Sequence, residues 1–200
     1  MKIGIINYGC GNTSNIIKAF NRIGVNCGLV EKKKDLMSFE KIILPGMGSA
    51  LHAMKILKQN KLDLYIKKFN ENLNPILGIC LGFQIALNNY EITKSNKIKC
   101  LSLIKGNVKK IENINVPLPI INWIKLESKN NKENLKNKKF YFAHGYYCDL
   151  SLKQKNITFI KVDNKKIISS YENKNLYFYQ FHPELSGENG LDLLKKFKEL

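Results

Sequence analysis

One cysteine of this chain stands between two glycines, in the run Gly78-Ile79-Cys80-Leu81-Gly82. A short apolar stretch opened by Pro75 leads into it, which is typical of a buried strand, and a helical pattern follows. The glycines predict a tight strand-to-helix turn, because a Cβ at either position would collide with the crossing backbone. Such a turn would hold a thiol at a sheet edge beside helix N-terminal N–H groups, which favour a thiolate. A lone cysteine is more often a buried structural residue, so a catalytic interpretation needs partners elsewhere in the chain.

A histidine and a glutamate near the C-terminus are the candidate partners. His182 and Glu184 follow the aromatic run Tyr177–Phe181, which is typical of a strand. Residues two apart in extended chain point to the same side, and Pro183 stiffens the link between them. His182 could deprotonate Cys80 and then protonate a leaving amine, while Glu184 orients the imidazole and stabilises its charged form. The three residues together predict a Cys-His-Glu triad for acyl transfer.

A glycine-rich loop at Pro45-Gly46-Met47-Gly48 offers a further element of such a site. It follows the apolar run at 41–44 and precedes a helical pattern at 51–57. Backbone N–H groups in a loop of this kind can point at an anion, such as the oxyanion of an acyl intermediate. An ordinary turn between strand and helix is the alternative for so short a motif.

The first half of the chain must build the scaffold for these residues. Apolar runs predict strands at 2–7, 25–30, 41–44 and 75–79, and helical patterns lie between them at 14–23, 51–57 and 62–69. This alternation predicts βαβ units and a parallel sheet, whose loops meet at one edge.

The second half of the chain has the pattern of short strands and not of alternating strands and helices. Short runs rich in Ile, Val, Phe and Tyr predict strands, several of them antiparallel, at 98–104, 107–112, 120–127, 139–143, 157–162, 166–171 and 175–181. A lysine- and asparagine-rich loop is expected at 128–139, and an amphipathic helix at Leu191–Leu200 closes the chain. The expected fold is α/β, an open and largely parallel central sheet flanked by helices with added antiparallel strands, in a single domain at 1–200.

Composition narrows the function classes. The net charge of +17 invites nucleic-acid binding, but Arg22 is the only arginine, and base and phosphate recognition favours arginine. Attraction of a phosphorylated small molecule or an acidic partner subunit fits the lysines better. The five cysteines are scattered without a paired spacing, so neither a zinc site nor a disulfide framework is expected. No apolar run is long enough for a membrane span or a secretory signal, so a cytoplasmic protein is expected.

Several motifs resemble those of the class I (triad) glutamine amidotransferases. The elbow Gly78–Gln84, the run Phe181–Glu184 and the loop Pro45–Gly48 carry this resemblance. Within that family, the chain is similar to the glutaminase subunits of imidazole glycerol phosphate synthases. This narrower likeness rests on Tyr8–Asn12, on Tyr141–His144 and on the Pro-Glu-x-Ser-Gly run at 183–187.

The resemblance implies a role for each site residue. Cys80 attacks the side-chain amide of glutamine, His182 acts as base and then acid, and Glu184 orients it. Met47, Gly48 and Leu81 would supply the oxyanion hole, Gln84 would contact the substrate, and Gly145 and Tyr146 would line its pocket. No cofactor and no metal are implied. Ammonia would pass directly to a (β/α)₈ cyclase partner, which makes imidazole glycerol phosphate and aminoimidazole carboxamide ribotide for histidine and purine synthesis.

Departures from the family pattern leave the partner open. Asn122, Gly145 and Leu185 replace residues usual in the family, and several such positions lie where the family meets its synthase or channels ammonia. The alternative is a related glutaminase that supplies a synthase-like partner aminating a surface-polysaccharide sugar. A hydrolase acting alone on γ-glutamyl substrates is a further alternative. His144 is either a helper at the ammonia exit or a core residue, and His52, Cys10 and Cys148 carry no predicted role.

Overall fold

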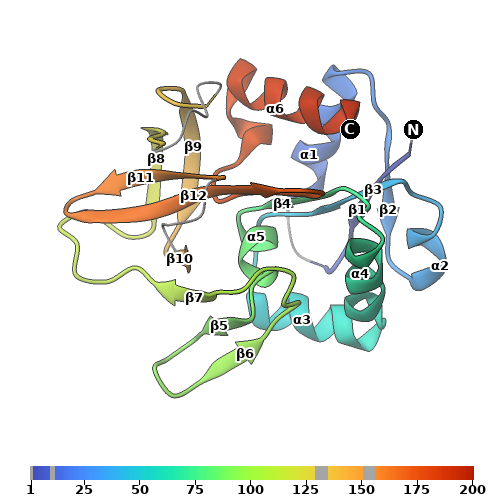
Figure 1. The fold of residues 1–200 in the computed structure, drawn as a ribbon, viewed down its shortest axis with the longest axis horizontal. Helices are drawn as coiled ribbons and strands as arrows, with labels where there is room; N and C mark the ends of the chain where they lie inside the picture. The colour runs from blue at the N-terminus through green and yellow to red at the C-terminus, as the bar shows by residue number, and fades with distance from the viewer. Residues whose placement is uncertain (1, 10–11, 129–134, 151–155) are drawn as a thin grey trace.

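A seven-stranded sheet runs through the middle of the molecule, in the order β11-β12-β13-β4-β3-β1-β2 (Figure 1). The computed structural model describes residues 2–9, 12–128, 135–150 and 156–200. Cys10 and Gly11, and residues 129–134 of the loop expected at 128–139, lie outside this range. The strands are β1 (Ile3–Ile6), β2 (Cys27–Val30), β3 (Lys41–Leu44), β4 (Ile76–Ile79), β11 (Ile157–Val162), β12 (Lys165–Asn173) and β13 (Leu176–Tyr179).

The five strands from β2 to β13 pair in parallel, and β12 and β11 continue the sheet antiparallel. The predicted fold class is therefore confirmed. The parallel strands are almost wholly apolar because both of their faces are covered by helices.

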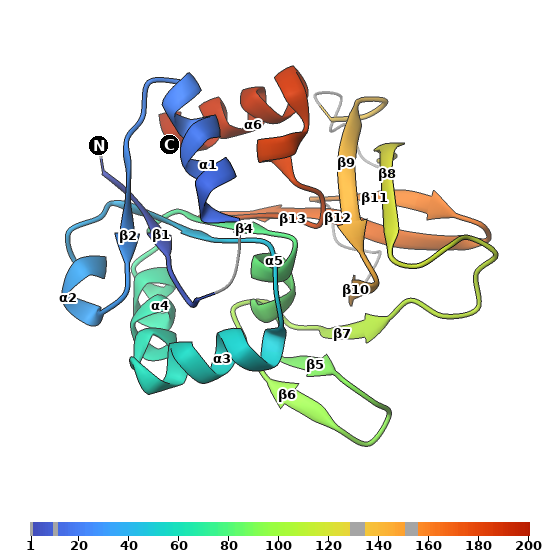
Figure 2. The same ribbon diagram turned by 180° about the vertical axis from the view of Figure 1, so that it is seen from behind.

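Helices cover the two faces of the sheet, as the view from behind shows (Figure 2). α1 (Thr13–Arg22) and α6 (Gly187–Glu199) lie on one face, and α3 (Ala50–Gln59), α4 (Leu62–Glu71) and α5 (Leu81–Ile85) lie on the other. Two clusters of buried apolar side chains match these two faces. The short α2 (Lys33–Leu36) lies beside β2 and α4. No helix in the described part of the chain has both the length and the apolar character needed to cross a bilayer.

Two helix ends differ from the prediction. α1 begins at Thr13, not at residue 14, and the side chain of Asn12 caps it by accepting a hydrogen bond from the backbone N–H of Asn15. α6 begins at Gly187, not at Leu191. Its first turn carries little apolar periodicity, which is why the sequence pattern missed it.

The second half adds two small sheets. β5 (Asn89–Glu91), β6 (Lys97–Lys99), β7 (Asn107–Lys110) and β10 (Tyr146–Asp149) form one of them, and β8 (Ile120–Lys125) pairs with β9 (Lys139–His144) in the other. A bridge between Glu127 and Phe159 ties the β8–β9 pair to the edge of the main sheet.

The strand predicted at 98–104 is wrong beyond Lys99. The backbone N–H groups of Leu101, Ser102 and Leu103 donate to the last carbonyls around α5 instead of joining a strand. Leu101 and Ile104 are buried, so their apolar character reflects a packed loop that satisfies the helix end.

The turn from β4 into α5 depends on two glycines. A Cβ on Gly82 would lie 2.0 Å from the carbonyl oxygen of Leu44, so the predicted collision with backbone is confirmed there. At Gly78 the obstacle differs, because a Cβ would first meet the ring of Phe178, at 2.1 Å. β3 and β13 therefore pack closely against the elbow, one on each side.

Gly82→Ala should destabilise the protein by at least about 2 kcal/mol, because the added methyl has to displace the backbone of β3. Urea unfolding would measure this, with Gly145→Ala as the control, since a Cβ there meets its nearest atom, on Pro119, at 3.9 Å. Equal unfolding midpoints for the two variants would contradict this account of the elbow.

Candidate active site

Three neighbouring strands deliver the candidate residues to one edge of the sheet. Cys80 follows β4, the loop from Pro45 follows β3 on one side, and His182 follows β13 on the other. Cys80 adopts φ 43° and ψ −100°, a conformation that residues other than glycine rarely take. Its N–H donates to the carbonyl of Tyr179 at 2.7 Å, which ties the elbow to β13. A strained residue held by surrounding structure is typical of functional sites.

His182 and Glu184 form a buried pair. Nδ1 of His182 lies 2.9 Å from Oε1 of Glu184, and each side chain is only 1% exposed. The main chain of His182 is held by β9, since its N–H donates to the carbonyl of Tyr141 at 2.9 Å. The hydroxyl of Ser186 donates to the carbonyl of His182 and accepts from the N–H of Tyr141. The imidazole is thus oriented by a carboxylate and by a strand of the β8–β9 pair.

The protonation of His182 follows from its partners. Burial by itself lowers the pKa of His182, but hydrogen bonds with Cys80 and Glu184, with their charges, outweigh it and raise the pKa to about 10. An imidazole that is charged at neutral pH, with Nδ1 directed at Glu184, leaves Nε2 to act on Cys80. This arrangement can hold a thiolate and can return a proton to a leaving nitrogen.

A chain of side-chain amides reaches the sulfur from the other side. Nε2 of Gln180 lies 3.4 Å from Sγ of Cys80, and Oε1 of Gln180 accepts from Nε2 of Gln84 at 3.1 Å. The same nitrogen of Gln84 donates to the carbonyl of Tyr146 at 3.2 Å. Gln84 and Gln180 are buried, at 4% and 0% exposed. The structure therefore joins the predicted residues Cys80, Gln84 and Tyr146 through a residue that was not predicted.

The loop predicted to bind the oxyanion lies against the elbow. The N–H of Leu81 donates to the carbonyl of Gly46 at 3.2 Å, so this predicted donor is occupied. A Cβ on Gly46 would lie 3.1 Å from Cε1 of His182. Met47 is 48% exposed, and Gly48 adopts φ 114°. The loop therefore lies at the site, with the carbonyl of Gly46 directed at the N–H of Leu81.

Other candidates fall into two groups. His144 is buried beside the site, where its Nδ1 lies 2.8 Å from the carbonyl of Tyr146 and its Nε2 has no partner in the structure. Burial lowers the pKa of His144 to about 4, against the effect of that hydrogen bond. Gly145 joins His144 to Tyr146 at the end of β9, whereas His52 lies on α3. Within the described ranges, no group of His, Cys, Asp or Glu side chains could hold a metal ion.

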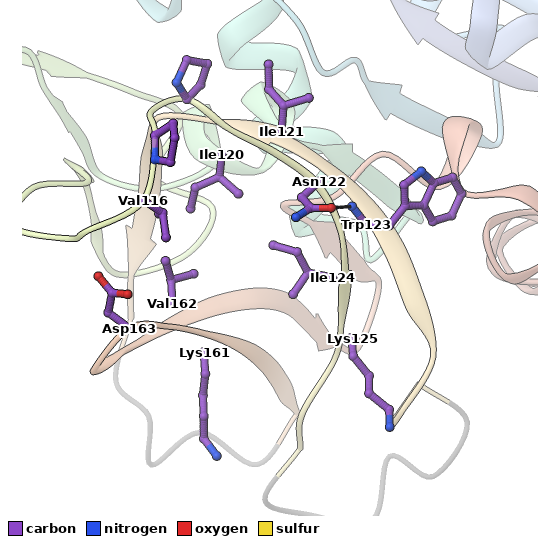
Figure 3. A pocket seen from close by; sticks show the side chains of 12 residues that line it. Val116, Ile120, Ile121, Asn122, Trp123, Ile124, Lys125, Lys161, Val162 and Asp163 are labelled. Atoms are coloured by element: carbon purple, nitrogen blue, oxygen red, sulfur yellow. Dashed lines mark hydrogen bonds between the residues drawn. The ribbon is translucent and has the colours of Figure 1, made fainter.

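The β8–β9 pair also shapes the surface next to the site. A groove of about 760 Å³ lies between β8 and β11, with Ile120 and Ile124 pointing toward Val162 (Figure 3). Ile121 and Trp123 are also among the residues around this groove, and they are 61% and 48% exposed (Figure 3). Two exposed apolar side chains on one strand are the kind of surface that contacts another protein.

Sequence reasoning missed Gln180 and Gly46. Gln180 precedes His182 by two residues, so the alternation of a strand already places both on one side. Gly46 belongs to the predicted loop, but its role depends on which carbonyl faces the elbow. That orientation cannot be read from residue types.

Comparisons with known proteins agree with this arrangement. The family model for glutamine amidotransferase class-I matches residues 4–199. The chain is 34% identical over 203 residues to the imidazole glycerol phosphate synthase subunit HisH of Haemophilus influenzae, covering 100% of this chain and 98% of that one. It is 30% identical over 199 residues to the subunit of the same name from Chlorobaculum tepidum, with 98% of each covered.

Solved structures show the same fold. A crystal structure of a glutamine amidotransferase matches with a TM-score of 0.77 at 17% identity, over 100% of this chain and 98% of that one. The structure of PurLQS from Thermotoga maritima matches with a TM-score of 0.73 at 22% identity, over 99% and 97%.

The pKa values of the two buried histidines should be shifted in opposite directions from the ordinary value for histidine. By NMR of ¹³C-labelled histidine, His182 should remain protonated through neutral pH and lose its proton near pH 10, while His144 should gain one only near pH 4. Cys80→Ala removes one of the two partners that raise the pKa of His182 and should lower it by about one unit or more. A His182 that titrates near the ordinary value of about 6.5 in the unmodified protein would contradict the assignment.

Proposed function

The chain belongs to the class I glutamine amidotransferases, and on this basis we propose that it is the glutaminase subunit of an imidazole glycerol phosphate synthase. It hydrolyses glutamine to glutamate and ammonia and delivers the ammonia to a (β/α)₈ cyclase subunit. That partner makes imidazole glycerol phosphate and aminoimidazole carboxamide ribotide. The observation that carries the proposal is the buried His182–Glu184 pair joined to a cysteine on a strained elbow.

The first half-reaction uses the charges already present. The thiolate of Cys80 attacks the side-chain carbonyl carbon of glutamine, and the C–N bond breaks to give a γ-glutamyl thioester. His182 gives its proton to the departing nitrogen, so ammonia leaves as a neutral molecule. Glu184 holds the ring so that Nε2 faces the reacting atoms throughout.

The second half-reaction reverses the roles. Neutral His182 takes a proton from water, and the resulting oxygen nucleophile attacks the thioester carbon. The C–S bond breaks, glutamate leaves, and the sulfur and imidazole return to their charged pair. No cofactor or metal enters either step.

Gln84 is suited to one end of the substrate. Both N–H groups of its amide are directed at protein acceptors, the carbonyl of Tyr146 and Oε1 of Gln180. Its carbonyl oxygen therefore remains to accept a hydrogen bond from the α-ammonium group of glutamine. Gly145 and Tyr146 stand next to this group and would line the same pocket.

The oxyanion loop supports control of the site by a partner. An oxyanion near Cys80 needs the N–H of Leu81, which now donates to the carbonyl of Gly46. Rotation of the Gly46–Met47 peptide would free this N–H and turn the N–H of Met47 toward the substrate. A chain in the arrangement described here should therefore hydrolyse glutamine slowly by itself.

The exposed face of β8 is the surface that we assign to the partner. Trp123 packs edge-on against Tyr141 with ring centroids 6.0 Å apart, and Tyr141 lies 6.4 Å from the ring of His182. A subunit that covers Ile121 and Trp123 would thus sit two rings away from the catalytic histidine. The alternative partner that aminates a surface-polysaccharide sugar is not favoured by the relatives reported above.

Glutamate release from glutamine tests the reaction. The purified chain should show a weak rate that rises steeply when the cyclase subunit and its ribonucleotide substrate are added. Cys80→Ala should lower the rate in the full mixture by at least about a thousandfold, because the nucleophile is lost, while binding of the partner persists.

An active Cys80→Ala protein would overturn the assignment of the nucleophile. If a glutamine-like alkylating agent still modifies Cys80 but the cyclase gives no stimulation, the ammonia acceptor is a different protein.

Ile121→Glu tests the partner surface. The new carboxylate would lose its hydration against an apolar face of the partner. The concentration of cyclase needed to stimulate glutamate release should therefore rise at least about tenfold. Leu64→Glu is the matched control, since Leu64 is 59% exposed on α4, away from β8. Equal effects of both substitutions would rule out the β8 face.

A further inference from the structure

We infer that Gln180 is a positioning residue for the nucleophile, which holds the sulfur of Cys80 with one end of its amide and Gln84 with the other. The inference rests on the proposed function, because it takes Cys80 as the nucleophile and Gln84 as a substrate contact. It assigns Gln180 no contact with the substrate.

The direction of the Gln180 amide follows from its neighbours. Nε2 of Gln84 donates both to Tyr146 and to Gln180, so the atom of Gln180 that faces Gln84 must be the acceptor, Oε1. The amide nitrogen then faces the sulfur, 3.4 Å away. The reverse orientation would set two NH₂ groups against each other.

The sulfur is the reason to regard this amide as more than core packing. A neutral thiol is a weak acceptor, so a fully buried N–H directed at one is poorly satisfied. A thiolate is a strong acceptor, and a hydrogen bond to a charged group stabilises more than a neutral one. The arrangement therefore favours the charged form of the sulfur, on the side opposite to His182.

The backbone fixes where this donor stands. The N–H of Gln180 donates to the carbonyl of Ser169 at 2.9 Å, which ties the end of β13 to β12. β13 pairs directly with β4, the strand that Cys80 follows. The same strand end thus supplies the histidine and the amide, two residues apart, so both partners of the sulfur move together.

The amide also links the sulfur to substrate recognition. Gln84 has one N–H on Gln180 and the other on the carbonyl of Tyr146, which also receives Nδ1 of His144. A shift of Gln84 on binding glutamine would be passed to Gln180 and so to the sulfur. Loss of Gln180 should therefore raise KM for glutamine as well as slow the chemical step.

Two substitutions separate positioning from packing. Gln180→Met removes the donor and acceptor at similar size, and Gln180→Glu keeps the acceptor for Gln84 but presents a carboxylate to the sulfur. A buried carboxyl beside a thiolate is protonated more readily than usual, and its O–H can then replace the amide donor. Cys148→Ala is the packing control, because it removes a buried thiol that donates to Oε1 of Gln180 at 4.0 Å and leaves the N–H groups that face Cys80 in place.

The experiment measures the rate at which iodoacetamide alkylates Cys80, followed by mass spectrometry of the peptide that contains it. For each variant, this rate is divided by the rate of the unmodified chain, once at mildly alkaline pH and once at mildly acidic pH. Gln180→Met should be slowed roughly ten- to a hundredfold at both pH values, the effect of losing a hydrogen bond to a charged group. In Gln180→Glu, alkylation of Cys80 should be slowed by a similar factor at alkaline pH. At acidic pH its rate should return toward that of the unmodified chain. Cys148→Ala should stay close to the unmodified rate.

Two results of this experiment would decide against the inference or its premise. Ratios near one for both Gln180 variants, with unchanged circular dichroism, would overturn the role of Gln180 while leaving the glutaminase assignment intact. A chain whose unmodified Cys80 neither reacts nor supports glutamate release would instead refute the proposed function.

Alkylation of the buried Cys100 and Cys148 would show that a Gln180 variant has unfolded. In that case the inference is tested by NMR of the Gln180 side-chain amide in chains that keep Gln180. The Gln180 side-chain protons should then shift between the unmodified chain and Cys80→Ala, and unchanged shifts would overturn the inference.

Discussion

The close approach of two strand ends is the constraint on which this structure depends. The carbonyl of Leu44, at the end of β3, occupies the space that a Cβ on Gly82 would need. β4 can therefore turn sharply into α5 directly beside β3, and the residue at the turn is forced into a left-handed conformation. That residue is Cys80, whose side chain consequently stands at the sheet edge instead of within the sheet. The loop Pro45–Gly48, which leaves the same β3, is brought against the elbow by the same contact.

The charge of the imidazole at the elbow depends on the balance between its hydrogen bonds and its burial. A fully enclosed imidazole should lose its charge, as His144 does, because burial lowers its pKa. His182 lies in nearly the same environment, yet Cys80 and Glu184 shift its pKa in the opposite direction. The two histidines differ in their partners: His144 has a backbone carbonyl, and His182 has two groups that carry negative charge. The charge at the site is therefore a property of the three-residue cluster, with Gln180 as its fourth member.

The β8–β9 pair serves the inside and the outside of the protein. On its inner side, the carbonyl of Tyr141 accepts from the N–H of His182, and the carbonyl of Ala143 lies 3.9 Å from the sulfur. On its outer side, β8 exposes Ile121 and Trp123. A two-stranded sheet that meets the main sheet at a single described bridge is suited to pass a displacement of β8 to the site.

The sequence by itself determined the parallel sheet, the elbow and the family, because these depend on local patterns: apolar periodicity, glycine spacing and short motifs. It also placed Cys80, His182 and Glu184 as candidates, which the fold then brings together. It could not place Gln180, whose partners Cys80 and Gln84 lie about 100 residues away in the chain, nor could it show that Gly46 and not Met47 faces the elbow. It misread 98–104 as a strand, because apolar residues in a packed loop and in a strand have the same composition. Only tertiary structure decided these points, since hydrogen-bond partners and carbonyl directions are set by which strands lie side by side.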